Sequence, residues 1–472
     1  MKPVAIIGAG ITGLTAAFRL QEQGIPCVVY EASGHAGGVI HSTRENGYIA
    51  EAGPNILSEI SRTVSGLISD AGLARQRIYA NPAAHGNFLL HRGRLVSAPT
   101  SILKFFTTPI FTPRGKLRVC LEPFIGAKRS RDEESLASFV SRRLGPEFLE
   151  AVINPFVAGV YAGDPSLLSV RHGFPKLHSA EQLYGSLFRA QIFGTRARQR
   201  SGEICKKEAK RLSFDQGLEV LPTRLKERLG SALKLQTPVV AIRDLGDEWG
   251  VEFPGRFSHL NHPAPLHSAV LLAIPAHRLG HIEFHAQDAR TNALAPLAQI
   301  IHPPIASVVL GFRRNDVRHP LTGFGFLVPE SEKRRILGAI FSSSIFAGRA
   351  PSGHVTITAY LGGCRAPELA LAPATQVIAN ACAELRDILG ITGSPTFQHC
   401  TVVPHAIPQY NLGYDRFKQT MEQLETNHHG LFFAGTCKDG ISLGNSIISG
   451  HDVARRIRAC ISRKTLQVPQ PV

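Results

Sequence analysis

The stretch VAIIGAGITGL at residues 4–14 constrains the fold of this chain more than any other feature. Its first part, Val4–Ile7, is an apolar, β-branched run typical of a buried strand, and the residues after the last glycine have the pattern of a helix. Gly8, Gly10 and Gly13 occupy the turn between the two elements. In such a unit the glycines permit a tight turn, a close approach of backbone to a pyrophosphate and close helix–strand packing. The helix N-terminus adds free N–H groups and a positive dipole end, so the pattern predicts a dinucleotide site.

A second predicted strand narrows the choice of dinucleotide. IPCVVYEA, residues 25–32, carries Glu31 near its end, about 20 residues after the glycines, where a carboxylate holds a ribose hydroxyl. A carboxylate there disfavours a 2′-phosphate, so the ligand is FAD or NAD rather than NADP. The Gly37–Gly38 pair that follows favours a flavoprotein. The alternative interpretation is a glycine-rich turn with an incidental acid.

A similar strand–loop–helix pattern recurs in the C-terminal part, in GLFFAGTCKDGISLGNSIISGHDVARRI, residues 430–457. An apolar strand at 431–434 meets Gly435, and a polar loop leads to a helix that starts between Ser442 and Asn445. The N-terminus of that helix would face the isoalloxazine end of a flavin. The alternative is an ordinary C-terminal strand–helix unit. Since the two motifs lie far apart in the chain, the predicted nucleotide domain is discontinuous.

Composition excludes several other functions. The length of 472 residues suggests two or three domains. The net charge of +16 suits an anionic partner, but no element interleaves basic residues with aromatics, so we expect no nucleic-acid partner; the basic run at 196–211 is interpreted as a solvated loop. No apolar stretch is long enough to span a bilayer, and we expect the protein to face the cytoplasm. The cysteines form no CxxC, and the histidines at 277, 281 and 285 have no carboxylate cluster nearby, so we expect no metal site.

Four longer blocks show that the chain resembles the protoporphyrinogen oxidase family, FAD enzymes of haem biosynthesis, in particular the mitochondrial plant type. They are PFVAGVYAGDPSLLSVRHGFPKL (155–177), HPLTGFGFLVP (319–329), LGAIFSSSIFAGRAPSG (337–353) and GLFFAG…GISLGNSIISG (430–450). The generic glycine motifs are shared with amine oxidases and carotene desaturases, whereas these blocks are not. The resemblance extends over nearly the whole chain.

The resemblance implies an α/β plus α+β fold with three parts and a short tail at 464–472. One is a discontinuous Rossmann-like FAD domain of the p-hydroxybenzoate-hydroxylase type; the others are a substrate domain with a mixed antiparallel sheet and a helical membrane-binding domain. The implied ranges are 1–79, 230–296 and 405–463 for the FAD domain, 80–87, 188–229 and 297–404 for the substrate domain, and 88–187 for the membrane-binding domain.

The chemistry of residues 98–126 agrees with a membrane surface. Apolar side chains that enter the lipid boundary alternate there with bases that meet anionic headgroups, namely Ile102, Leu103, Phe105, Phe106, Ile110 and Phe111 beside Lys104, Arg114, Lys116 and Arg118. The alternative is a domain core with a basic rim. The resemblance favours a monotopic, peripheral membrane protein that forms a homodimer and passes its product to a ferrochelatase.

The implied reaction is the oxygen-dependent oxidation of protoporphyrinogen IX to protoporphyrin IX through noncovalent FAD, with hydrogen peroxide as by-product. The cofactor supplies the chemistry, so no catalytic acid, base or nucleophile is predicted, and the sequence has no HExxH, nucleophile elbow or paired-carboxylate motif. Three alternatives stay open: a coproporphyrinogen III oxidase of the same fold, another flavin amine oxidase or desaturase, and a non-catalytic FAD-binding membrane scaffold.

Site residues follow from the resemblance position by position. The residues implied for FAD are Gly8, Ala9, Gly10, Ile11, Thr12, Gly13, Glu31, Gly37, Gly38, Val39, Gly53, Pro54, Asn55, Ile56, Val239, Thr436, Ile441, Ser442 and Leu443. The residues implied for the substrate are Asn87, Gly159, Leu327, Ile340 and Tyr360.

Two of the substrate positions depart from the family pattern. Tyr360 stands where a phenylalanine is expected and brings a hydroxyl that needs a partner. Asn87 stands where the family has an arginine that clamps a propionate, and an amide cannot form that ion pair. Arg92, Arg94 or Arg171 are candidates to compensate. The preferred porphyrinogen and the response to the family's inhibitors are therefore open.

Overall fold

A five-stranded parallel sheet forms the centre of the nucleotide-binding part in the computed structural model, which describes residues 1–84, 86–99, 101–128, 132–193, 209–255, 265–286 and 289–467. Its strands come from distant parts of the chain, in the order β10 (Leu233–Lys234), β2 (Cys27–Tyr30), β1 (Val4–Ile7), β14 (Ala269–Leu272) and β22 (Leu431–Phe433). The predicted Rossmann-like, discontinuous sheet is therefore confirmed. Most of the basic run at 196–211 and the last residues of the tail lie outside the described ranges.

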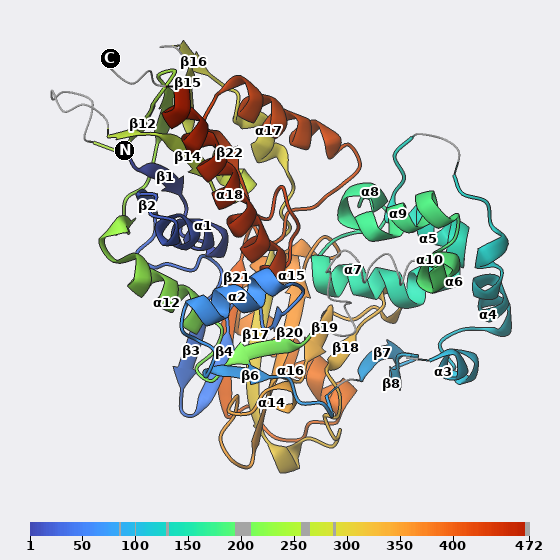
Figure 1. Cartoon of the computed structure of the whole chain (residues 1–472). Helices are drawn as coiled ribbons and strands as arrows, with labels where there is room; N and C mark the ends of the chain where they lie inside the picture. Colours follow the sequence, from blue (N-terminus) through green and yellow to red (C-terminus); the bar gives the residue numbers. More distant parts are fainter. Residues whose placement is uncertain are drawn as a thin grey trace, which may run out of the picture.

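The two faces of this sheet are covered differently (Figure 1). On one face lie the helices α1 (Ile11–Glu22), α12 (Val220–Leu229) and α18 (Leu443–Gln467), whose apolar side chains share one core with β1 and β2. On the other face lie α13 (Ala276–Leu279), α17 (Asp415–Asn427) and a second sheet of β13 (Leu266–His267), β12 (Trp249–Glu252), β11 (Ala241–Asp244), β15 (Glu283–Ala286) and β16 (Ala289–Thr291).

A seven-stranded sheet forms the lower part of the molecule in Figure 1. All its pairs are antiparallel except the parallel pair β18–β7, so the predicted mixed sheet is confirmed. One face packs on α16 (Ala374–Leu389). The strand order is β21 (Phe397–Val403), β17 (Ile305–Arg313), β20 (His354–Gly362), β19 (Gly338–Ile340), β18 (Gly325–Leu327), β7 (Asn87–His91) and β8 (Arg94–Ser97).

Short elements connect the two large sheets. A hairpin of β3 (Ser42–Glu45) and β4 (Tyr48–Glu51) lies against β17, and α14 (Ser342–Ile345) and α15 (Pro367–Leu371) pack on β20. A three-stranded sheet of β5 (Leu57–Ser58), β9 (Arg211–Phe214) and β6 (Arg77–Tyr79) lies near α2 (Arg62–Asp70) in Figure 1.

A helical part lies beyond β7 and β8, on the right in Figure 1. Its core is built from α5, α7 and the segment around Leu168. The helices are α3 (Ile102–Thr107), α4 (Pro113–Cys120), α5 (Leu136–Leu144), α6 (Pro146–Phe148), the π-helix η2 (Leu149–Ile153), α7 (Asn154–Tyr161), α8 (Val170–Gly173), α9 (Pro175–Tyr184) and α10 (Leu187–Phe193).

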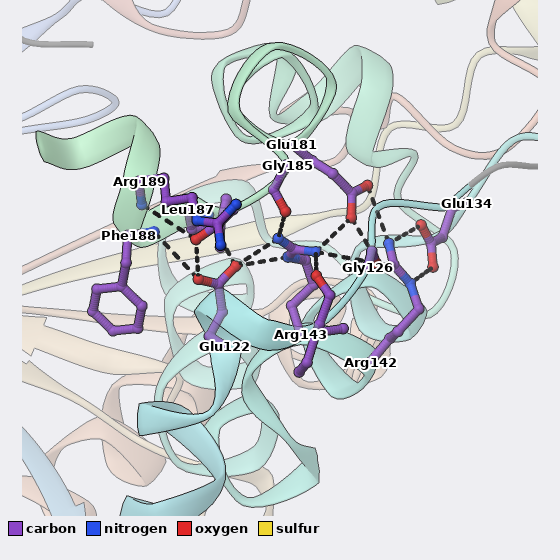
Figure 2. Close-up of polar contacts among 12 residues, drawn as sticks. Glu122, Gly126, Glu134, Arg142, Arg143, Glu181, Gly185, Leu187, Phe188 and Arg189 are labelled. Carbon is purple, nitrogen blue, oxygen red and sulfur yellow. Dashed lines mark hydrogen bonds and ion pairs between the residues drawn. The ribbon is translucent and has the colours of Figure 1, made fainter. Parts of the chain in front are cut away.

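A buried charge network fixes these helices to one another (Figure 2). The fully buried Arg143 of α5 pairs with Glu122 (2.8 Å) and Glu181 of α9 (3.0 Å), while Arg142 joins Glu181 to Glu134. Glu122 also accepts hydrogen bonds from the N–H groups that begin α10. A buried charge is tolerated only when it is paired and hydrogen-bonded, so removal of one partner would destabilise the whole helical part.

Candidate functional site

The glycine turn between β1 and α1 has the geometry that a phosphate site needs. Gly8 has φ +105°, which a side chain disfavours, and a Cβ at Gly13 would lie 2.0 Å from the carbonyl oxygen of Gly8. By contrast, a Cβ at Gly10 would have no atom within 4 Å, and no side chain caps α1. Open space therefore lies in front of a helix N-terminus whose N–H groups have no capping side chain.

Two more loops of bare backbone adjoin this turn. The Gly37 N–H donates to Ala9 O at 2.8 Å, and a Cβ at Gly38 would lie 3.4 Å from Gly10 Cα. A Cβ at Gly53 would lie 2.3 Å from Val39 O, so the Gly53–Ile56 loop continues the same surface. The structure thus brings together the first three predicted cofactor segments.

Glu31 is held at the end of β2 by backbone donors. One carboxylate oxygen accepts the Ala9 N–H at 2.7 Å and the other accepts the Ser33 N–H at 2.9 Å. The Thr237 N–H donates to the carbonyl of Glu31 at 2.8 Å, which places the segment leading to Val239 beside the same end of β2.

The C-terminal motif meets the N-terminal one. Ser442 caps α18 by accepting the Asn445 N–H at 3.1 Å, and the Thr12 hydroxyl donates to Ser446 O at 3.1 Å. A Cβ at Gly450 would lie 2.4 Å from Thr12 O, so the two helices are in close contact. The predicted start of α18 is confirmed: the helix begins at Leu443, and Ile441 lies immediately before the capping Ser442.

Sequence reasoning missed two tyrosines that shape the loop before α18. Tyr410 accepts the Gly440 N–H at 2.9 Å and donates to Thr436 O, and Tyr414 donates to Cys437 O at 2.7 Å. Burial raises the pKa of both phenols, so they remain protonated donors. Both tyrosines precede α17, so no helical spacing in the sequence marked them.

These segments fit FAD. The uncapped end of α1 and the open space at Gly10 suit a diphosphate, the Glu31 carboxylate suits ribose hydroxyls, and α18 offers a second helix N-terminus. The contact of each residue with the cofactor stays a prediction.

Four of the five predicted substrate residues share one face of the seven-stranded sheet. Asn87 pairs with Gly325 and Gly325 with Ile340, while Leu327 and Tyr360 both pair with Gly338. Directly paired residues, and residues two apart, point to the same side of a sheet. The intervening side chains Phe326, Ala339 and Ala359 are buried against α16, whereas Leu327, Ile340 and Tyr360 are half-buried.

Gly159 covers this face from α7. A Cβ at Gly159 would lie 2.4 Å from Leu327 Cδ2, so a larger residue would displace that side chain. The helix therefore packs against Leu327 as closely as glycine allows. The resemblance implies that the backbone carbonyl of Gly159 faces the pyrrole N–H groups of the substrate, and this role stays a prediction.

A small cavity joins the substrate face to the Gly53–Ile56 loop. Its walls include Ile340, Asn55 and Ile56, together with Glu51 and Arg349, which sequence reasoning did not single out. Arg349 is 2% exposed, lies 3.7 Å from Glu51, and donates to Ser213 Oγ at 2.6 Å. Burial raises the pKa of the Glu51 carboxyl despite its hydrogen bonds from Ser42 and Leu218.

Asn87 is exposed at the start of β7. The three arginines that were candidates to bind a carboxylate in its place lie elsewhere. Arg171 lies on α8 and pairs with Asp415 at 3.0 Å. Arg92 and Arg94 flank the β7–β8 turn, at the opposite end of β7 from Asn87.

The histidines named above do not form one helix face. His277 lies on α13, which ends at Leu279, and His285 lies on β15. Within the described ranges no group of three or more His, Cys, Asp or Glu residues is arranged to hold a metal ion.

The stretch 98–126 divides into exposed and buried parts. Ile102, Leu103 and Phe106 of α3 are exposed, but Ile110 and Phe111 are buried against Leu89, so the expectation that these two enter lipid is wrong. Two of the four basic side chains form hydrogen bonds within the protein: Lys116 donates to Phe106 O at 2.7 Å, and Arg118 donates to Arg143 O at 3.1 Å. No helix in the described part of the chain has the length and apolarity that crossing a membrane requires.

Comparison with known proteins identifies the fold and the relatives. Residues 11–458 match the model of the flavin-containing amine oxidoreductase family. The chain is 30% identical to protoporphyrinogen oxidase 2 of Arabidopsis thaliana over 95% of this chain and 92% of that protein, and 26% identical to coproporphyrinogen III oxidase of Bacillus subtilis over 95% and 96%. A crystal structure of a candidate protoporphyrinogen oxidase from Exiguobacterium sp. 255-15 superposes with a TM-score of 0.79 at 25% identity, covering 97% of this chain and 99% of that one.

Proposed function

The chain belongs to the flavin-containing amine oxidoreductase family, and we propose that within this family it oxidises protoporphyrinogen IX to protoporphyrin IX with molecular oxygen as acceptor. It is an FAD-dependent oxidoreductase. The Gly8–Gly13 turn would hold the diphosphate, Glu31 the ribose and the start of α18 the isoalloxazine. When bound, FAD supplies two-electron oxidation, and the protein's own residues bind and orient the substrate.

The observation that carries the proposal is the half-open sheet face beside the cofactor loop. Leu327, Ile340 and Tyr360 present an apolar and aromatic surface, and Gly159 closes it from above. A largely apolar macrocycle, whose oxidised product is flat and aromatic, is matched by such a wall, because dispersion contacts and ring stacking need no charged group. The Asn55 contact of Tyr360 places this surface next to the Gly53–Ile56 loop.

Coproporphyrinogen III is the second candidate substrate. The Bacillus subtilis relative is named for it, and Asn87 offers no positive charge to select a particular pattern of carboxylates. Both porphyrinogens should be supplied to the purified, FAD-loaded protein under air. Growth of porphyrin fluorescence above the rate without enzyme supports the proposal. The porphyrinogen that is oxidised faster is then the preferred substrate. No enzyme-dependent fluorescence with either would refute it.

We also propose peripheral attachment to a membrane through α3 and its neighbours. Ile102 and Leu103 are 79% and 75% exposed, Phe124 is 82% exposed, and the exposed bases Lys104 and Arg114 lie close in sequence to them. Exposed apolar side chains beside bases suit the boundary of an anionic bilayer. A homodimer and transfer of product to a ferrochelatase stay predictions of the resemblance.

Sedimentation with anionic vesicles tests the attachment. The protein should pellet at low salt and be released at high salt, and the double variant I102S/L103S should lose most of the binding. L371S is the matched control, because Leu371 is 58% exposed but lies on α15, outside the helical part. Equal sedimentation of wild type and I102S/L103S would contradict the assignment.

A further inference from the structure

One side-chain hydrogen bond joins the predicted cofactor loop to the predicted substrate face. Asn55 Nδ2 donates to Tyr360 Oη at 2.6 Å, and the same amide nitrogen lies 3.3 Å from Gly53 O. Asn55 belongs to the Gly53–Ile56 loop after β4, whereas Tyr360 belongs to β20, so the bond connects segments that are 305 residues apart.

The environment of this bond keeps the phenol neutral. Tyr360 is half-buried, and burial together with the nearby Glu51 carboxylate raises the pKa of its phenol, so the group that accepts the Asn55 amide is a hydroxyl. The adjoining cavity is walled by the apolar side chains of Ile340, Ile56 and Phe346 and also by the buried Glu51 and Arg349, so the bond lies where an apolar wall meets a buried polar pair.

We propose that Tyr360 is a positioning residue, which holds the Gly53–Ile56 loop in its FAD-binding shape through Asn55 and thereby couples cofactor binding to the substrate face. A phenylalanine at this position would provide the same ring but no acceptor for Asn55. The contribution of the hydroxyl can therefore be separated by experiment from that of the ring.

The physical basis is preorganisation. Gly53 brings a bare backbone to the loop, and without the Asn55–Tyr360 bond more loop conformations become accessible. The apparent affinity for a ligand falls with the fraction of protein that holds the binding-competent shape. The inference rests on the proposed placement of FAD against this loop, and it does not require that the substrate is a porphyrinogen.

FAD titration of the flavin-free protein tests the inference. The Kd of FAD, followed by quenching of flavin fluorescence, is measured for wild type, Y360F, N55A and the double variant N55A/Y360F. Loss of one neutral hydrogen bond corresponds to roughly a two- to tenfold weaker Kd for Y360F. In the double variant, Y360F should add nothing to the effect of N55A, because the bond is already absent. The visible circular dichroism of bound flavin should also change in Y360F.

Y48F is the matched control. Tyr48 makes a hydroxyl contact of similar length, 2.7 Å to Thr396 Oγ1, but its partner is not in the cofactor loop. Its Kd for FAD should equal that of wild type. An unchanged Kd in Y360F, independent effects of N55A and Y360F, or an equal loss in Y48F would each overturn the inference. If the coupling is found but neither porphyrinogen reacts, the role of Tyr360 stands while the proposed substrate falls.

Discussion

Gly10 and Gly13 should respond in opposite ways to the same added methyl group. A Cβ at Gly10 meets no atom within 4 Å, and its φ of −67° and ψ of 169° suit alanine. Gly10→Ala should therefore leave the flavin-free protein as stable as wild type, or more stable by about 0.4–1 kcal/mol through the unfolded chain. A Cβ at Gly13 would lie 2.0 Å from Gly8 O, so Gly13→Ala should destabilise the protein by about 3 kcal/mol or more.

The effect of Gly10→Ala should appear only when FAD is added. The methyl would project into the open space in front of α1, where a diphosphate must approach the backbone. Loss of one hydrogen bond to a charged phosphate oxygen corresponds to about 1.5–3 kcal/mol, or roughly a 10- to 160-fold weaker Kd.

Thermal melting without FAD and fluorescence titration with FAD measure the two effects separately. The reasoning predicts normal melting with poor FAD binding for Gly10→Ala, and a lowered melting temperature for Gly13→Ala before any cofactor is added. If Gly10→Ala binds FAD as tightly as wild type, the diphosphate does not lie at this helix end.

Three further predictions concern the substrate face and acid stability. Asn87→Arg should lower the KM for protoporphyrinogen about fivefold with little change in kcat, since an ion pair replaces a neutral contact; equal KM values for Asn87→Arg and Asn87→Ala would refute contact with a carboxylate. Gly159→Ala should raise KM several-fold at nearly unchanged melting temperature, because the new Cβ displaces only the flexible end of Leu327 at 2.4 Å; an unchanged KM would argue against substrate at this face. Burial lowers the pKa of His267 and His277 from 6.5 to about 4. Between these two pH values the unfolded chain binds more protons than the folded chain, so the free energy of unfolding should fall as pH drops from about 6.5 to about 4. Melting temperatures across that range should decline in wild type and decline less in His277→Gln; identical slopes would contradict this assignment.

The parts of the fold that could be predicted from the sequence are those that depend on short-range patterns. The Gly8–Gly13 turn and the start of α18 depend on short-range rules of strand periodicity, turn geometry and helix capping, and the structure places both as expected. Asn87, Leu327, Ile340 and Tyr360 were named from resemblance alone, and their common sheet face appears only in the structure, because register depends on pairing between distant strands.

What the sequence could not predict is which side chains the tertiary fold buries or pairs. Ile110 and Phe111 are apolar residues of the same types as the exposed residues of α3, yet contacts with Leu89 bury them. The Arg143–Glu122 pair had no sequence signal, because charged residues are normally expected at the surface. The Asn55–Tyr360 bond likewise depends on packing between parts of the chain that share no local pattern.

Simultaneous recording of oxygen uptake and porphyrin fluorescence with FAD-loaded protein and protoporphyrinogen tests the central claim most directly. Conversion of the porphyrinogen to the porphyrin removes six electrons in pairs, so the account predicts about three O₂ consumed, and as much hydrogen peroxide formed, per porphyrin. Gly10→Ala, which should fold but bind little FAD, should show only the background rate at a limiting FAD concentration. Fluorescence that grows no faster with the wild-type protein than in buffer, or grows without oxygen uptake, would contradict the account.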